Sequence, residues 1–130
     1  MKKANDIIKI RYTISLFDVA SLRAHTRYVY ELYPDGKVSF AHYEKGIRKP
    51  KATDEKRTAS ASDFMQLSAE LSACIETADR VEMYDDDTGA EAIIYRPFGR
   101  IDTMGRGYGN SETNIGQLLS KYIYGVGGYQ

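Results

Sequence analysis

Tryptophan is absent from this chain of 130 residues, and cysteine, histidine and proline are scarce. The single cysteine, Cys74, excludes an intramolecular disulfide and fits a reducing compartment. The two histidines, His25 and His42, have no partner at metal-ligand spacing, and a zinc site needs three or four ligands. The sequence therefore predicts no metal site, and it contains no motif that calls for a cofactor.

The chain also has no excess of charge of either sign, because 18 basic residues balance 18 acidic ones. A dedicated nucleic-acid binder is usually basic, so only a local patch could contact nucleic acid here. No apolar run is long enough to span a bilayer. Lys9 and Arg11 interrupt the run that a signal peptide would need after Lys2 and Lys3. We expect a cytoplasmic protein without membrane contact.

Tyrosine is abundant, with 11 copies, and the length fits one domain over residues 1–130. Tyrosine combines apolar area with a hydroxyl, and it is enriched where proteins meet partners. It is also a common strand former. Both interpretations stay open for each tyrosine.

The stretch 60–79 carries the strongest helical pattern. Ser60 followed by Asp63 forms a capping-box sequence at its start. Its apolar residues recur every three or four positions and form one stripe, which needs a sheet face to cover it. The stripe consists of Phe64, Leu67, Leu71, Cys74, Ile75 and Ala78. Because burial disfavours the thiolate, we interpret Cys74 as a core residue and not as a nucleophile.

Alternating residues predict strands in the first third of the chain. In 8–16 the apolar positions are Ile8, Ile10, Tyr12, Ile14 and Leu16. The stretches 26–33 and 37–43 flank Pro34-Asp35-Gly36, a turn sequence that predicts a hairpin. Val38 and Phe40 should face the core, with His42 half-buried in phase with them. Residues 18–25 are expected to form a loop or a short helical turn.

Residues 44–59 are predicted to form an exposed basic loop that could extend the hairpin's second strand, because Pro50 limits regular structure there. A basic segment beside an aromatic residue could contact phosphates or an acidic protein. The candidate binding residues in this segment are Lys45, Arg48, Lys49, Lys51 and Arg57.

The stretches 81–84 and 90–96 predict a second hairpin around 85–89, with Gly89 in the left-handed conformation. Asp85, Asp86 and Asp87 resemble part of a calcium loop, but the EF-hand spacing is absent, so a turn is favoured. Pro97 should end the strand, and 100–104 should add a short one.

A glycine-rich stretch, 105–110, precedes the last helix and is predicted to be a flexible loop. Glycines let backbone N–H groups approach an anion, and a helix N-terminus attracts negative charge. A plain connection is the alternative interpretation. The candidate anion-binding residues are Arg96, Arg100, Arg106, Gly107 and Tyr108.

The last helix is predicted over 111–124, capped by Asn110 or Ser111 and ended by Gly125, with a frayed tail at 125–130. Its apolar stripe consists of Ile115, Leu118, Leu119, Tyr122 and Ile123. The element order β-β-β-α-β-β-(β)-α predicts an α+β two-layer sandwich. Its mainly antiparallel sheet should have about five to six strands, with both helices on one face.

No assembled catalytic motif is present, although catalytic groups that meet only in space stay open. We expect a small non-enzymatic protein-binding module, of the kind used as inhibitors, immunity proteins or accessory factors of bacteria and phages. The origin is inferred from size and type, not from chemistry. The alternative is a domain that binds a nucleotide or another anion at 105–109. The expected partner is another protein, and the oligomeric state is not predicted.

Overall fold

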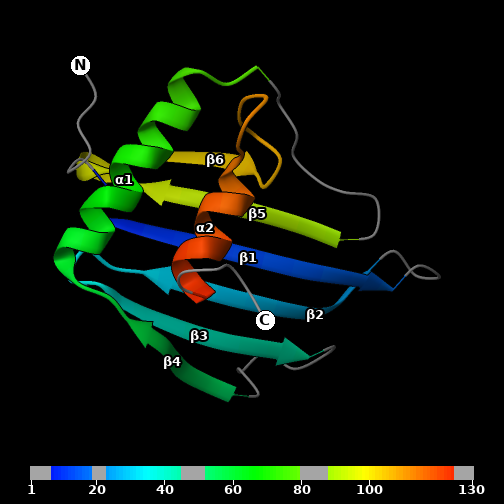
Figure 1. Cartoon of the computed structure of the whole chain (residues 1–130). Coiled ribbons are helices and arrows are strands. Elements are labelled where there is room, and N and C mark those ends of the chain that lie inside the picture. Colours follow the sequence, from blue (N-terminus) through cyan, green and yellow to red (C-terminus); the bar gives the residue numbers. More distant parts are fainter. Residues whose placement is uncertain (1–6, 19–22, 45–51, 80–87, 125–130) are drawn as a thin grey trace.

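The computed structural model describes residues 7–18, 23–44, 52–79 and 88–124, with side chains described for 7–15, 26–44, 59–79 and 90–124. The elements in chain order are β1 (Lys9–Asp18), β2 (Arg23–Leu32), β3 (Lys37–Glu44), β4 (Ala52–Thr58), α1 (Ala61–Glu76), β5 (Thr88–Tyr95), the 3-10 turn η2 (Pro97–Gly99), β6 (Ile101–Gly105) and α2 (Ile115–Tyr124) (Figure 1).

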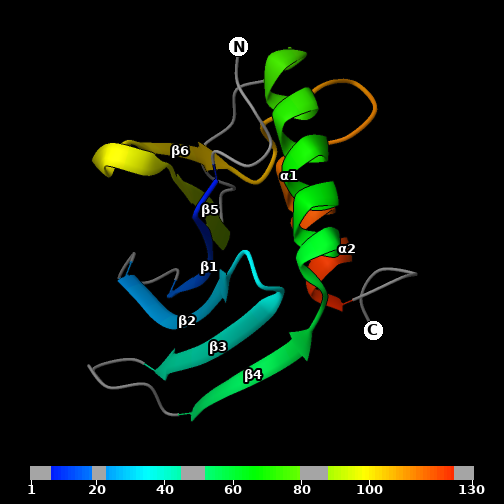
Figure 2. The ribbon, with the colours of Figure 1, turned by 90° about the vertical axis from the view of Figure 1, so that its left-hand side faces the viewer.

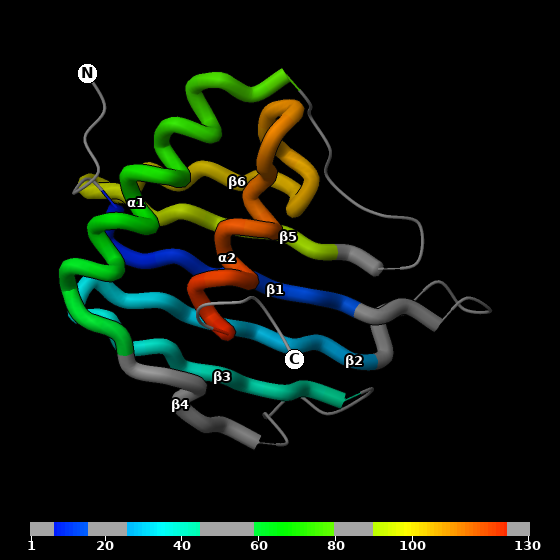
Figure 3. The backbone as a smooth tube through the Cα atoms, viewed as in Figure 1, coloured from blue at the N-terminus to red at the C-terminus, as the bar shows by residue number. Residues whose placement is uncertain are grey.

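The sheet has six strands in the order β4-β3-β2-β1-β5-β6, and every neighbouring pair is antiparallel. Both helices lie on the same side of this sheet (Figure 2). The backbone trace shows α1 running obliquely over the strands, with α2 beside it (Figure 3). The predicted α+β two-layer sandwich is confirmed. None of the described helices is long and apolar enough to cross a membrane.

The core lies between the helices and one face of the sheet. On β1, Ile10 and Tyr12 point into it and are 0% and 3% exposed. From α1, Leu67 and Leu71 are 3% and 0% exposed, so the predicted stripe faces the sheet. The prediction for Ile8 is wrong, because β1 begins one residue later and this side chain is 50% exposed.

The hairpin between β2 and β3 forms at Pro34-Asp35-Gly36 as predicted. The Asp35 carboxylate accepts the Lys37 backbone N–H at 3.0 Å, and Gly36 adopts a φ of 96°. A Cβ on Gly36 would lie 2.2 Å from the Ala59 carbonyl oxygen, so no larger residue fits. The Ala59 N–H donates to the Gly36 carbonyl at 2.8 Å, which ties this turn to the start of α1.

Reciprocal hydrogen bonds cap both helices. Ser60 and Asp63 form the predicted capping box at α1, with distances of 2.9 and 3.0 Å. The cap predicted for α2 is wrong, because Asn114 exchanges the same kind of bonds with Gln117 at 3.0 and 2.8 Å. Asn110 instead accepts two loop N–H groups, from Glu112 and Thr113.

The expectation of an exposed loop over 44–59 is wrong for residues 52–58, because they form β4 and pair with β3. This strand is the edge of the sheet and its sequence is almost wholly polar, so it lacks the alternation that reveals a half-buried strand. Charged residues are typical of edge strands, where they discourage pairing with other chains.

The predicted hairpin around Gly89 is also wrong. Gly89 lies within β5, opposite Ser15 of β1, and β5 pairs with β1 and β6. The predicted strand at 81–84 and the acidic residues at 85–87 lie outside the described residues, as does the tail from residue 125. The short strand after Pro97 is confirmed as β6. Between the first two strands, β1 reaches Asp18 and β2 begins at Arg23, so both ends of the predicted connection 18–25 are strand, and 19–22 lie outside the described residues.

Candidate functional site: the open face of the sheet

The face of the sheet opposite the helices is not covered by any described element (Figure 2). Side chains alternate along each strand, and the register therefore sets which residues share this face. We call this surface the open face. It consists of Lys9, Arg11, Thr13, Ser15, Arg27, Val29, Glu31, Ser39, Ala41, Tyr43, Glu91, Ile93, Tyr95, Ile101 and Thr103.

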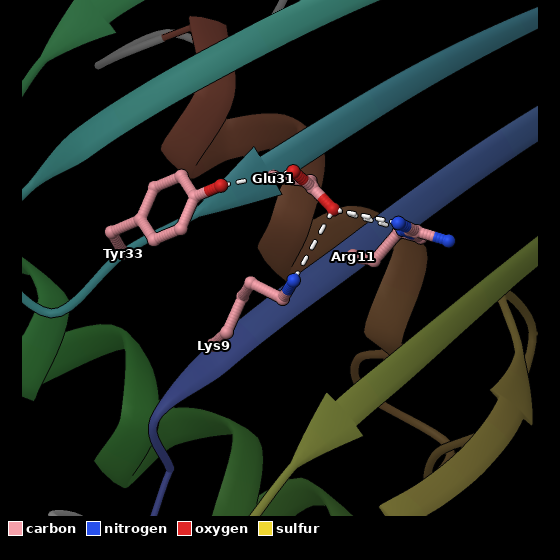
Figure 4. Close-up of polar contacts among 4 residues, drawn as sticks. All are labelled: Lys9, Arg11, Glu31 and Tyr33. Atoms are coloured by element: carbon pink, nitrogen blue, oxygen red, sulfur yellow. Dashed lines mark hydrogen bonds and ion pairs between the residues drawn. The ribbon is translucent and has the colours of Figure 1, made fainter.

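A group of charged side chains lies on the open face where β1 begins and β2 ends (Figure 4). The Arg11 Nε and Nη2 lie 3.0 and 2.9 Å from one carboxylate oxygen of Glu31, and the Lys9 Nζ lies 3.4 Å from the same oxygen. The Tyr33 hydroxyl donates to the other oxygen at 2.9 Å. Two cations and one hydroxyl therefore hold a single carboxylate.

The surroundings of Glu31 shift several pKa values. Burial alone would raise the pKa of Glu31, but the hydrogen bonds from Tyr33 and Arg11 and the nearby positive charges outweigh it, so this pKa is lowered. Burial and the bond to the carboxylate raise the pKa of Tyr33. The bond to Glu31 also raises the pKa of Arg11. Glu31 and Arg11 consequently stay charged at neutral pH, and the Tyr33 hydroxyl stays protonated.

Two tyrosines on the open face carry cations above their rings. The Lys9 Nζ lies 4.7 Å from the ring centroid of Tyr95, and the Arg27 guanidinium carbon lies 4.7 Å from that of Tyr43. Cation–π contacts at exposed sites contribute about 0.5–1 kcal/mol each.

Other tyrosines face the helices. Tyr12 and Tyr30 are 3% and 5% exposed, and the Tyr30 hydroxyl lies 2.9 Å from that of Tyr124 on α2. On the same face Tyr28 stacks on His42, with ring centroids 4.8 Å apart, and His42 is half-buried as predicted. The tyrosines of the sheet are therefore divided between its two faces, and a role in meeting a partner stays a prediction for those on the open face.

The candidate residues of the basic segment are mostly not placed. Lys45, Arg48, Lys49 and Lys51 lie outside the described residues. Arg57 lies in β4, where the backbone is described but the side chain is not. A binding role for this segment stays a prediction.

The candidate anion-binding arginines are not brought together. Arg96 is 2% exposed and its Nε lies 2.6 Å from Asp102, whereas Arg100 and Arg106 are exposed. Arg100 and Arg106 flank β6, which has five residues, so roughly 16 Å of strand separates them.

The glycine-rich stretch is not a loose loop, because hydrogen bonds connect it to three elements. The Arg106 N–H donates to the Ala90 carbonyl of β5 at 3.3 Å, and the Arg106 carbonyl accepts the Gly116 N–H of α2 at 2.8 Å. The Asp79 N–H, just after α1, donates to the Gly109 carbonyl at 2.8 Å. Gly107 is buried and Tyr108 is half-buried.

Close packing accounts for Gly109. A Cβ at this position would lie 2.4 Å from the Thr113 carbonyl oxygen and 3.0 Å from the Cys74 sulfur. Cys74 itself is 2% exposed and is a core residue, as expected. The nucleotide-binding alternative stays a prediction.

The open face was missed in the sequence because it depends on register. Lys9 and Arg11 alternate with apolar residues, and Glu31 does so in a second stretch. Only the pairing of Arg11 with Glu31 brings the opposite charges together. Within the described part of the chain, no group of three or more His, Cys, Asp or Glu side chains could hold a metal ion.

Comparisons with known proteins give no family. No family model matches the chain, and no solved structure matches it. A segment of 98 residues is 26% identical to the UDP-N-acetylglucosamine--N-acetylmuramyl-(pentapeptide) pyrophosphoryl-undecaprenol N-acetylglucosamine transferases of two strains of Methylorubrum extorquens. It covers 75% of this chain but only 23% of each transferase. The chain is therefore similar to a small part of these enzymes, and the likeness assigns it no activity.

Proposed function

We propose that this protein is a binding module that recognises another protein through the open face of its sheet. One observation carries the proposal. Both helices cover one face, while the other presents half-exposed tyrosines and a group of fixed charges. A role as an inhibitor, immunity or accessory factor stays a prediction within this proposal.

The composition of the open face supports a protein partner. On the open face, Tyr43 and Tyr95 lie beside the aliphatic side chains of Val29 and Ile93. Aromatic residues and arginine are enriched where proteins bind each other and supply most anchors of such interfaces.

The charged side chains of the open face are already held in place, and this also supports a protein partner. Arg11 and Lys9 are already held by Glu31 and Tyr95, so binding would cost less side-chain entropy than ordering free arginines and lysines. The mixture of signs, with Glu31 and Glu91 among the cations, suits a protein surface with its own pattern of charge. A nucleic-acid surface would need positive charge along its whole length.

The test uses the full chain as bait in the cells that produce it, followed by affinity measurements with the purified partner. Tyr43→Ala and Arg11→Ala should each weaken binding by about tenfold or more, because interface anchors cost at least about 1–2 kcal/mol when truncated. The control is Met65→Ala, on the exposed side of α1, where the side chain is 51% exposed. Melting temperatures must show that all three variants fold.

The proposal fails if both open-face variants bind the partner as tightly as the wild type. It also fails if Met65→Ala alone reduces binding, since the working surface would then lie on the helices.

A further inference from the structure

The turn η2, between β5 and β6, presents one fully exposed aromatic side chain. Phe98 is 98% exposed, more than any other large hydrophobic side chain among the described residues. In Figure 2 this yellow turn lies on the side of the sheet away from α1 and α2. Nothing in the core accounts for a phenylalanine at this position, because its ring packs on no core residue of the described chain.

The backbone does not account for Phe98 either. Its φ is 65° and its ψ is 32°, and it is the only residue other than glycine with positive φ in the described part of the chain. An L-residue in this conformation is strained, and glycine or asparagine is the usual occupant. Strained residues that persist in a fold are candidates for function.

The turn is held rigidly at its base. The Arg96 N–H donates to the Arg100 carbonyl at 2.8 Å, and Tyr95 pairs with Ile101. The buried Arg96 side chain is paired with Asp102 at 2.6 Å. The ring of Phe98 is therefore displayed from a fixed support, which reduces the entropy lost on binding.

The neighbourhood of Phe98 is apolar and positively charged. Ile101 is 54% exposed and lies beside Tyr95 on the open face through backbone pairing. Arg100 is exposed and has no ion-pair partner among the described residues, whereas the carboxylate of Asp102 is committed to Arg96. The exposed rim of this corner thus carries positive charge that a partner would have to match.

We infer that Phe98 is an anchor that inserts into an apolar pocket of a different protein, a pocket whose rim is acidic. The inference rests on the proposed function and adds a defined contact at the corner of the sheet. The ring would fill the pocket, Ile101 would pack against its edge, and Arg100 would pair with rim carboxylates. A buried aromatic with an adjacent arginine is the usual composition of an interface hot spot.

Two other occupants fit the corner less well. A second copy of this chain would bring Arg100 against Arg100 in a symmetric contact, and like charges in close proximity oppose association. A membrane would gain only one phenylalanine ring, while even a whole myristoyl chain gives marginal attachment. Both remain as outcomes of the test.

The experiment places the photoreactive residue p-benzoylphenylalanine at position 98 of the full chain, and at Met65 as the control, in the cells that produce the protein. A protein crosslinked only from position 98 is identified, purified and titrated with the wild type and with Phe98→Gly, Phe98→Leu and Arg100→Ala. Self-association is measured by sedimentation, and membrane binding with vesicles of phosphatidylcholine and phosphatidylserine.

Phe98→Gly should lose between about tenfold and a hundredfold in affinity, the range expected for burying one phenylalanine side chain. Its melting temperature should be unchanged or higher, because glycine relieves the strain. Phe98→Leu should retain most of the binding. Arg100→Ala should weaken binding and reduce its dependence on salt.

The inference is overturned if no protein is crosslinked specifically from position 98, or if Phe98→Gly binds the partner as the wild type does. Self-association or vesicle binding that depends on Phe98 would overturn it as well. Loss of binding in Tyr43→Ala with full binding in Phe98→Gly would leave the proposed function standing and refute this inference alone.

Discussion

Arg96 places a positive charge in the interior of the protein. Its side chain is almost fully buried, and its Nη1 and Nη2 atoms have no hydrogen-bond partner within the described part of the chain. The charge that balances it is Asp102, at 2.6 Å from Nε. A buried cation with a single carboxylate partner is stable only while that partner is present.

Replacing Asp102 by Ala should therefore destabilise the fold by about 3 kcal/mol, since it leaves an uncompensated buried charge. Urea denaturation of wild type and variant would measure the loss. The double variant Arg96→Met with Asp102→Ala should recover most of it, because no buried charge remains. A loss below about 0.5 kcal/mol in the single variant would show that Arg96 reaches water on its own.

Glu31 gives a prediction that depends on pH. Its pKa in the folded protein is lowered, so the carboxylate stabilises the fold above its unfolded pKa, about 4.3. This contribution is lost as the pH falls through the lower, folded pKa. Glu31→Gln should cost up to about 1 kcal/mol at pH 7, and the cost should shrink as the pH falls below the unfolded pKa of about 4.3.

Denaturation of wild type and Glu31→Gln across this pH range would check the expectation. Tyr33→Phe, which removes one of the hydrogen bonds to the carboxylate, should show a smaller effect with the same sign. An equal difference between wild type and Glu31→Gln at pH 3 and pH 7 would contradict this account of the ion group.

At the scale of elements, the segment between β6 and α2 acts as a connector that also fastens the end of α1. Gly109 allows this close approach, and the Asn110 side chain donates to the Thr77 hydroxyl at 2.7 Å. The segment therefore holds three elements together, where the sequence alone indicated a flexible loop.

Gly109→Ala should cost about 2–3 kcal/mol, because its Cβ would overlap the Thr113 carbonyl and the neighbouring backbone must shift. Thermal denaturation would measure it. Gly99→Ala is the matched control, since nothing lies within 4 Å of its Cβ and its φ of 76° alone should cost about 1 kcal/mol. Equal losses at the two positions would mean that crowding at Gly109 is relieved without cost.

Elements with a local signal could be predicted from the sequence. The alternation around Ile10 and Tyr12, the turn at 34–36 and the capping box at Ser60 depend on neighbouring residues alone, and the structure contains all three. β4 was missed because an edge strand needs no apolar face.

The partner of β5 was missed for a different reason. Local patterns favour pairing with the preceding stretch, whereas Ile94 lies beside Ile10 from the start of the chain. The open face could not be predicted either, because its charged group exists only in the register of β1 and β2. The exposure of Phe98 depends on the conformation of the turn. Pro97 indicates that the strand ends there, but it does not determine which conformation the turn adopts.

For the whole molecule, the position of β1 governs the order of assembly. This first strand lies between β2 and β5, so one of its two hydrogen-bonding edges stays open until the chain has been made as far as Tyr95. During synthesis the earlier strands and α1 can associate, but they present an unpaired edge of a type that recruits other chains. The pairing of β5 closes that edge, and it joins stretches far apart in the sequence, such as Lys9 and Tyr95, which is the kind of contact that slows folding.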